Sequence, residues 1–150
     1  MQILEHQSLF LYNVISYKTF LPVSKIPEIT EHLHRNINAL GVELTGNIML
    51  KKIDDDTGRN FEILVPVSEA VKSRQEYSYK PIFKLLHAVT VRHEGNYLNI
   101  AQTEQKLMDY IEKKSYQKAT VPYYSIVRLD TDNTNSCIVD IYVGVNYNVL

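Results

Sequence analysis

The residues best suited to chemistry are two carboxylates at matching places in two similar segments. Glu62 lies in the apolar run 61–67, and Asp140 lies in the apolar run 139–145, 78 positions later. Successive side chains of a strand point to opposite faces, so each acid lies on the face opposite to its apolar neighbours. A carboxylate in a partly dehydrated cleft is costly unless a ligand or donor neutralises it. We therefore predict that Glu62 and Asp140 line a common groove that favours organic cations or hydrogen-bond donors.

Tyrosines are the second group of candidate binding residues. The chain has eleven tyrosines and no tryptophan. A tyrosine offers a flat apolar ring with a polar tip, and ring faces attract cations. We predict that Tyr17, Tyr123 and Tyr142 lie on the groove face and Tyr97 at the start of a helix, and that together they form the walls of the ligand site. Each of them taken alone is better explained by ordinary packing, and only the set points to a ligand site.

The histidines do not predict a metal site or a catalytic centre. His32 and His34 are two positions apart on a predicted helix and face different sides, whereas a chelating pair is four apart. His93 beside Glu94 has the residue types of a base and its partner, but a histidine at a strand end beside a solvated glutamate is the commoner arrangement. We expect no metal, no cofactor and no catalytic residue.

Two further motifs have structural interpretations. The acidic run 54–56 precedes Gly58 but lacks the alternating ligands and the distal glutamate of a calcium loop, so it predicts a polar hairpin turn. Cys137 is the only cysteine, which excludes an intramolecular disulfide, and its apolar neighbours predict that its thiol packs as a small hydrophobe.

These residues are placed by a pattern of elements that occurs twice. Strands are predicted at 9–20, 47–53, 61–67, 85–93, 121–129 and 137–145, with helices at about 24–41 and 97–114. Ser24 and Asn96 are the predicted N-caps, and Gly41 ends the first helix. The apolar positions of the first helix recur 74 positions later in the second, as Ile26, Leu33 and Ile37 against Ile100, Leu107 and Ile111.

The pattern predicts an α+β fold made of duplicated β-α-β-β halves. We expect one domain over residues 1–150, with halves at about 8–67 and 84–146 and a linker at 68–83. The predicted architecture is an antiparallel sheet with two helices on one face and a ligand groove on the other.

Composition excludes some classes of function. Sixteen Lys and Arg oppose seventeen Asp and Glu, for a formal net charge of -1, whereas nucleic-acid binding is driven by basic excess. The first residues lack the pattern of a signal peptide, and no run approaches the roughly 20 apolar residues of a membrane span. We expect a cytoplasmic protein without direct nucleic-acid or membrane contacts.

Four short segments resemble a known family. Residues 65–69 close the first half with a Pro-Val strand end, residues 93–97 contain a Gly-x-Tyr helix start, and residues 122–124 and 140–145 form a closing hairpin. In this order and spacing they resemble the gyrase-inhibitor-like effector-binding domains. The resemblance implies a groove for small, often cationic or aromatic molecules. Such domains occur fused to DNA-binding segments in multidrug-responsive bacterial regulators and also free-standing, and this chain resembles a free-standing member.

The chain departs from that family at the predicted strand 123–127. Members often carry a glutamate there, whereas this strand has none, so a cation-selective pocket would depend on Glu62 or Asp140. Gly144 also replaces the proline of the second Pro-Val strand end.

Three functions are consistent with these features. The first is a small-molecule effector-binding protein associated with bacterial transcription regulation but without a DNA-binding domain of its own. The second is a hydrolase that uses Glu62 or Asp140 with a tyrosine as acid–base partners. The third is a protein-interaction module that acts through tyrosines and sheet edges. An open groove with unpaired acids favours the first two, and a filled groove beside a large apolar patch favours the third.

Overall fold

The computed structural model describes residues 2–20, 25–53, 60–130 and 135–148. The chain forms two compact units. The continuous unit is Phe10–Lys84, and the discontinuous unit combines Met1–Leu9 with Leu85–Leu150. Two long strands, β1 (Ile3–Phe20) and β4 (Ser78–Asn96), contribute residues to both units.

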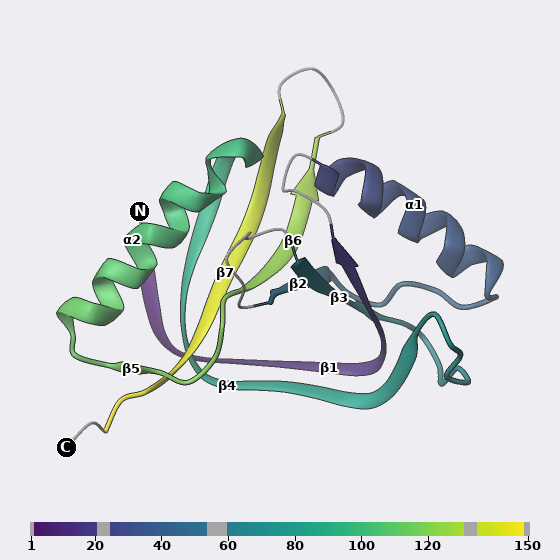
Figure 1. Ribbon diagram of the computed structural model, residues 1–150, viewed down its shortest axis with the longest axis horizontal. Coiled ribbons are helices and arrows are strands. Elements are labelled where there is room, and N and C mark those ends of the chain that lie inside the picture. The colour runs from purple at the N-terminus through teal and green to yellow at the C-terminus, as the bar shows by residue number, and fades with distance from the viewer. Residues whose placement is uncertain (1, 21–24, 54–59, 131–134, 149–150) are drawn as a thin grey trace. The chain divides into compact units, whose positions relative to one another are not determined.

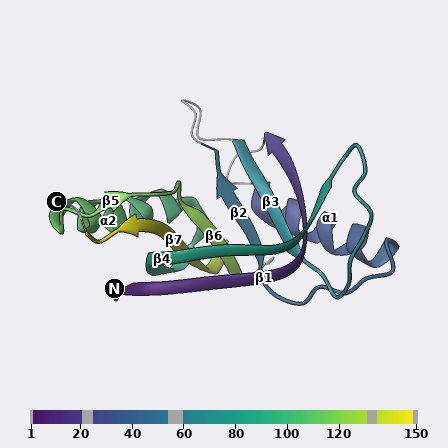
Figure 2. The ribbon, with the colours of Figure 1, turned by 90° about the horizontal axis from the view of Figure 1, so that it is seen from below.

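The continuous unit is built around β3 (Asn60–Pro66), which pairs with two antiparallel neighbours. One neighbour is the second part of β1, and the other is β2 (Ile48–Lys52). Figure 2 shows β2 and β3 side by side near the end of β1. Helix α1 (Ile26–Ala39) buries Ile26, Leu33 and Ile37, the positions that periodicity predicted. Gly41 follows the helix at φ 76°, a left-handed conformation that glycine adopts at little cost.

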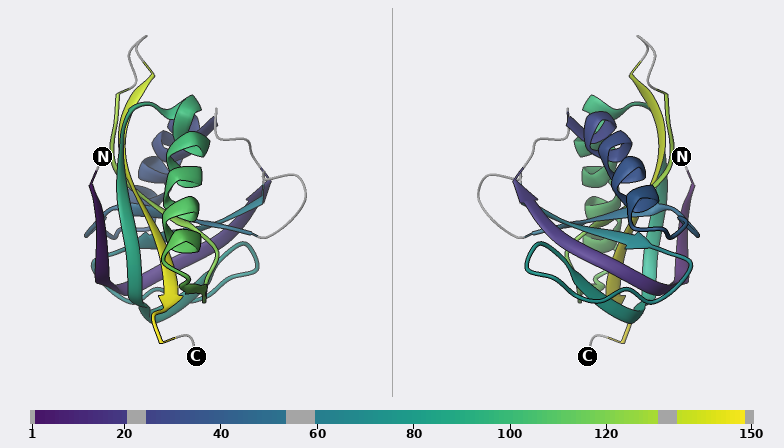
Figure 3. Two further views of the ribbon diagram at one scale, coloured as in Figure 1. Left: turned by 90° about the vertical axis from the view of Figure 1, so that its left-hand side faces the viewer. Right: turned by 90° about the vertical axis from the view of Figure 1, so that its right-hand side faces the viewer.

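The discontinuous unit is built around β7 (Ser136–Asn146), which pairs antiparallel with β4 and with β6 (Tyr123–Leu129). The short strand β5 (Gln117–Lys118) pairs with the end of β7. A 3-10 turn, η2 (Tyr97–Asn99), leads into helix α2 (Ile100–Lys113), which lies along β4 and β7 (Figures 1 and 3). The Asn96 side chain accepts a hydrogen bond from the Leu98 N–H at 2.9 Å, which confirms the predicted cap.

Alternate residues of β7 and β3 are buried, and parts of the opposite faces are buried as well, since Leu64 of β3 and Thr90 of the neighbouring β4 are 2% and 7% exposed. On β7 the buried side chains include Cys137, Val139, Ile141 and Val143, whereas Asp140 and Tyr142 on the alternate face are half-buried. On β3, Phe61, Ile63 and Val65 are buried, and Glu62 lies on the alternate face. Alternation along a strand therefore placed both acids on the faces that the sequence predicted.

The predicted α+β class is confirmed, since each unit combines a helix with strands and the strand pairings of the described residues are antiparallel. The elements follow the order strand–helix–strand–strand twice, with β5 added in the second round. The observed strands are longer than predicted at two places. β1 begins at Ile3 rather than at residue 9, and β4 begins at Ser78, inside the predicted linker 68–83.

The predicted Ser24 cap and the predicted acidic turn at 54–58 lie outside the described residues. Among the helices that the structure describes, none has the length and apolar character that crossing a membrane requires.

Candidate functional site

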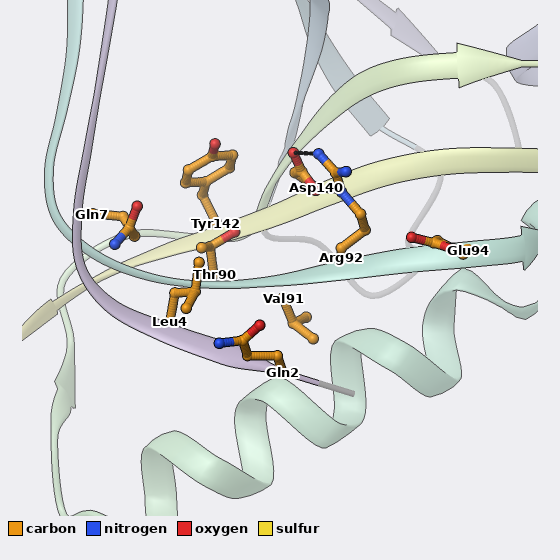
Figure 4. Close-up of a pocket in the computed structure, with 9 residues that line it drawn as sticks. All are labelled: Gln2, Leu4, Gln7, Thr90, Val91, Arg92, Glu94, Asp140 and Tyr142. Atoms are coloured by element: carbon orange, nitrogen blue, oxygen red, sulfur yellow. Dashed lines mark hydrogen bonds and ion pairs between the residues drawn. The ribbon is translucent and has the colours of Figure 1, made fainter.

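The discontinuous unit contains a pocket of about 560 Å³ on the face of β4 and β7 that is turned away from α2. Its walls come from three strands, as Figure 4 shows. The start of β1 contributes Gln2, Leu4 and Gln7, β4 contributes Thr90, Val91, Arg92 and Glu94, and β7 contributes Asp140 and Tyr142. This volume lies in the range of small-molecule sites, roughly 300–1,000 Å³.

Strand register brings the polar groups of this pocket together. Arg92 lies directly opposite Asp140, and Thr90 lies opposite Tyr142. Arg92 donates from Nε to Asp140 Oδ1 at 2.8 Å and from Nη2 to Oδ2 at 3.0 Å, a bidentate pair. The Thr90 hydroxyl donates to the Ile141 carbonyl at 2.8 Å. Asp140 is therefore neutralised by a protein cation, a partner that the sequence analysis did not predict.

The electrostatics of the pocket follow from this pair. The hydrogen bond and the charge of Asp140 raise the pKa of the Arg92 guanidinium, so it stays charged. Burial, with a smaller effect of the Asp140 charge, raises the pKa of the Tyr142 phenol. Tyr142 is therefore a protonated hydroxyl at neutral pH, able to donate a hydrogen bond and to offer its ring face.

Glu94 supplies the carboxylate that a ligand can reach. It lies further along β4 than Arg92, beyond the ion pair (Figure 4). Within the described residues the Glu94 side chain forms no hydrogen bond or salt bridge, and its charge acts on Arg92 only through space. With one cation and two carboxylates, the pocket carries an excess of negative charge.

The β1 wall depends on an irregularity at His6. This residue has φ 57°, so the regular alternation of the strand is broken there, and Gln7 joins Gln2 and Leu4 at the pocket. Between them, the Glu5 carboxylate accepts hydrogen bonds from the Tyr110 and Tyr116 hydroxyls, both at 2.6 Å. These bonds fix the first strand beside the pocket.

The predicted site residues fall into different places. Asp140 and Tyr142 are brought together in this pocket. Tyr123 lies on the neighbouring strand β6, directly opposite Tyr142 of β7, and is buried. Tyr97 lies at the helix start as predicted, but it is buried, and its hydroxyl donates to Asn135 Oδ1 at 3.2 Å.

Glu62 and Tyr17 belong to the continuous unit. Glu62 lines a pocket of about 550 Å³ there, and Lys80 Nζ lies 3.6 Å from its Oε1. Tyr17 also borders this pocket, and in the β1–β3 register it lies opposite Ile63. Its phenol borders a cavity beside α1 with Ile29 and His32, and burial raises its pKa to about 12.

His93 is a buried structural residue. Its Nδ1 lies 2.6 Å from the Thr103 hydroxyl and its Nε2 lies 2.8 Å from the Asn96 carbonyl, so both ring nitrogens are occupied. Cys137 is buried as predicted, and burial raises the pKa of its thiol to about 11. Among the described residues, no three His, Cys, Asp or Glu side chains are grouped so as to hold a metal ion.

Sequence reasoning missed Arg92, Glu94 and the β1 residues of the pocket. Alternation along β4 was a usable signal, since Thr90, Arg92 and Glu94 are polar residues two apart in an apolar strand. What alternation does not provide is the register that sets Arg92 opposite Asp140.

Comparison with known proteins identifies the fold. No family model matches the sequence, and no curated protein is significantly similar to it. The C-terminal domain of EcmrR superposes with a TM-score of 0.68 and 20% identity over 94% of this chain and 98% of that domain. In the cryo-EM structure of EcmrR with DNA the TM-score is 0.72 at 18% identity, again over 94% of this chain but only 57% of EcmrR.

Two other structures share the fold. SAV2435 bound to tetraphenylphosphonium has a TM-score of 0.53 and 13% identity over 97% of this chain and 93% of that one. A hydrolase from Listeria innocua has a TM-score of 0.61 and 9% identity over 97% of this chain and 91% of the hydrolase. The chain therefore has the fold of the effector-binding domains, as the sequence resemblance predicted, and that fold also occurs in a hydrolase.

Proposed function

We propose that this protein binds a small organic molecule with one positive charge and an aromatic body in the pocket of the discontinuous unit. The proposal rests on one observation: Glu94, the Arg92–Asp140 pair and Tyr142 line the same pocket of about 560 Å³. The excess carboxylate attracts a cation, and the Tyr142 ring offers a flat surface for an aromatic group or a cation. SAV2435, which shares the fold, was solved with an aromatic cation.

The biological role that fits this binding is a ligand sensor for transcription regulation. EcmrR carries a domain of this fold and was solved on DNA, and this chain spans 57% of it. We infer that a partner protein that contacts DNA responds to the ligand-bound state of this chain, as the resemblance implies.

The same groups favour binding over hydrolysis. Asp140 is tied to Arg92 by two hydrogen bonds, which lowers its availability as a base. The raised pKa of Tyr142 keeps its phenol protonated, so this residue is a poor base near neutral pH. The hydrolase alternative would have to rely on Glu94 alone.

Fluorescence titration with rhodamine 6G and calorimetry with tetraphenylphosphonium test the proposal. We expect saturable binding of both by the wild type. Glu94→Gln should weaken binding about fivefold, the effect of roughly 1 kcal/mol for a partly exposed charge. Tyr142→Ala should weaken it further, because the ring face is lost.

Glu112→Gln is the matched control, because it removes one exposed carboxylate from the same unit, on α2. We expect this variant to bind like the wild type. Absence of binding across a panel of aromatic cations, or equal loss in Glu94→Gln and Glu112→Gln, would contradict the proposed site.

A further inference from the structure

The pocket of the continuous unit is related to the first pocket position by position. It has a volume of about 550 Å³, and its polar lining includes Ser16, Lys18, Glu62, Glu76, Ser78 and Lys80. Four of these residues lie 74 positions from residues that line the first pocket, in the pairs Ser16 and Thr90, Lys18 and Arg92, Glu76 and Gln2, and Ser78 and Leu4. Glu62 and Asp140 form the fifth pair, 78 positions apart.

The strand register repeats in the same way. Lys18 lies directly opposite Glu62 in the β1–β3 pair, as Arg92 lies opposite Asp140 in the β4–β7 pair. The helices start at Ile26 and Ile100, and the left-handed residues of the two long strands, Asn13 and His87, are also 74 apart. This agreement of elements, register and backbone irregularity supports an internal duplication that repeated the pocket together with the fold.

The two pockets differ in charge. The first combines Arg92 with Glu94 and Asp140, whereas the second combines the cations Lys18 and Lys80 with the anions Glu62 and Glu76. The position that corresponds to Glu94 is Phe20, and the one that corresponds to Tyr142 is Leu64. The second pocket therefore lacks the excess acid that selects a cation and offers balanced charges of both signs.

The charged groups of the second pocket can be reached by a ligand. The Lys18 side chain is exposed and forms no hydrogen bond or salt bridge within the described residues. Lys80 Nζ lies 3.6 Å from Glu62 Oε1, with the Lys80 side chain 50% exposed and the Glu62 side chain 15% exposed. This separation is longer than a hydrogen bond, so the contact is loose and the lysine can move to another partner. A ligand with an ammonium and a carboxylate group can replace that contact by one partner for each charge. Tyr77 also borders the pocket and offers an apolar surface.

We propose that the continuous unit carries a second ligand site, for an aromatic zwitterion of amino-acid type. Glu62 and Glu76 bind the ammonium group, Lys18 and Lys80 bind the carboxylate, and Tyr77 contacts the ring. The chain then holds two sites of common origin that bind ligands of different charge. This inference does not depend on the cation site of the discontinuous unit.

Titration of the ¹⁵N-labelled full chain with L-tryptophan tests the inference by NMR. We expect saturable shifts of the backbone amides of Ser16, Lys18 and Ser78. Tryptamine, which lacks the carboxylate, and indole-3-propionate, which lacks the amine, should bind at least fivefold more weakly. The double substitution Lys18→Gln with Lys80→Gln should weaken L-tryptophan binding at least tenfold and leave tryptamine binding nearly unchanged.

Lys72→Gln with Lys84→Gln is the matched control, because it removes two exposed lysines of the same unit that do not line the pocket. This variant should bind L-tryptophan like the wild type. The inference is overturned if these amides do not shift, if the three indole compounds bind equally, or if the Lys18 and Lys80 substitutions have no effect. Shifts confined to the discontinuous unit would also overturn it while leaving the cation site intact.

Discussion

His93 and Thr103 illustrate the role of single buried polar residues in this protein. His93 is 5% exposed on β4, and Thr103 is 4% exposed on α2. The Asn96 carbonyl only accepts hydrogen bonds, so Nε2 carries the proton and Nδ1 accepts from the Thr103 hydroxyl. This short chain of bonds joins the end of β4 to the first turns of α2.

Thr103→Val should lower the free energy of unfolding by about 1–3 kcal/mol, because it leaves a buried ring nitrogen without a donor. Thr103→Ser keeps the hydroxyl and should cost less than Thr103→Val. Urea denaturation of the three proteins measures the difference. An equal cost for valine and serine would mean that the hydrogen bond contributes nothing.

Gly144 is a second residue whose identity is set by its neighbours. A Cβ at this position would lie 2.9 Å from Thr120 Cγ2 and 3.4 Å from Leu85 Cδ1. The Gly144 N–H also donates to Thr120 Oγ1 at 2.9 Å. The proline that the resemblance places here would therefore lose a hydrogen bond as well as clash.

Gly144→Ala should destabilise the protein by about 1–3 kcal/mol through overpacking. In a Thr120→Ser background the same change should cost less, because serine lacks the methyl group that the new Cβ meets. The four proteins form a double-mutant cycle that thermal or urea unfolding can measure. An identical cost in both backgrounds would refute the steric explanation.

At the scale of elements, hydrogen bonds to the Glu5 carboxylate connect the start of β1 with the end of α2 and the residues just after it. Glu5 accepts from Tyr110 and Tyr116 at 2.6 Å each. Nearby, the Tyr147 ring lies 4.1 Å from the His6 ring, and its hydroxyl accepts from the His6 N–H at 2.7 Å. Since Gln2, Leu4 and Gln7 form one wall of the pocket, these contacts position that wall.

This arrangement predicts a pH-dependent contribution of Glu5 to stability. The hydrogen bonds from Tyr110 and Tyr116 hold the pKa of Glu5 below its ordinary value of 4.5. A lowered pKa favours the ionised form in the folded state, so the stabilisation is present above about pH 4.5 and is lost as the pH falls below it. Glu5→Gln should lower Tm at pH 7 by about 2–4 °C.

The difference in Tm between wild type and Glu5→Gln should shrink as the pH is lowered through the acidic range. Differential scanning calorimetry across a pH series measures it. Glu112→Gln, which removes an exposed carboxylate from α2, should show little difference at any pH. A Glu5→Gln effect that stays constant down to low pH would exclude an ionised Glu5 as its source.

The helices and the core positions could be predicted from the sequence, because local periodicity determines them. The extent of β4 could not, since the stretch before Leu85 contains Pro81 and two lysines that resemble a linker, although proline is tolerated at strand edges. The face of Asp140 followed from alternation, whereas its partner Arg92 depends on register. The position of Tyr17 opposite Ile63 depends on register in the same way, because no local signal sets β1 against β3.

At the scale of the whole molecule, each described helix buries one face in a hydrophobic core. Helix α1 buries three residues and α2 buries four, so each covers the strands of its own unit. A recognition helix of a helix-turn-helix follows another helix after a short turn, whereas β2, β3 and β4 separate α1 from α2. The match to EcmrR extends over 98% of its C-terminal domain but only 57% of the chain solved on DNA.

This organisation predicts that the 150-residue chain forms no sequence-selective complex with duplex DNA. The formal net charge of -1 provides no basic excess to displace counterions from phosphate, which is the main source of affinity in DNA binding. A gel-shift assay at low salt with a pool of random duplexes, followed by sequencing of any retained fraction, measures selectivity. Enrichment of one motif that resists competition by unrelated DNA would contradict the prediction and place a DNA-reading surface on the strands or loops.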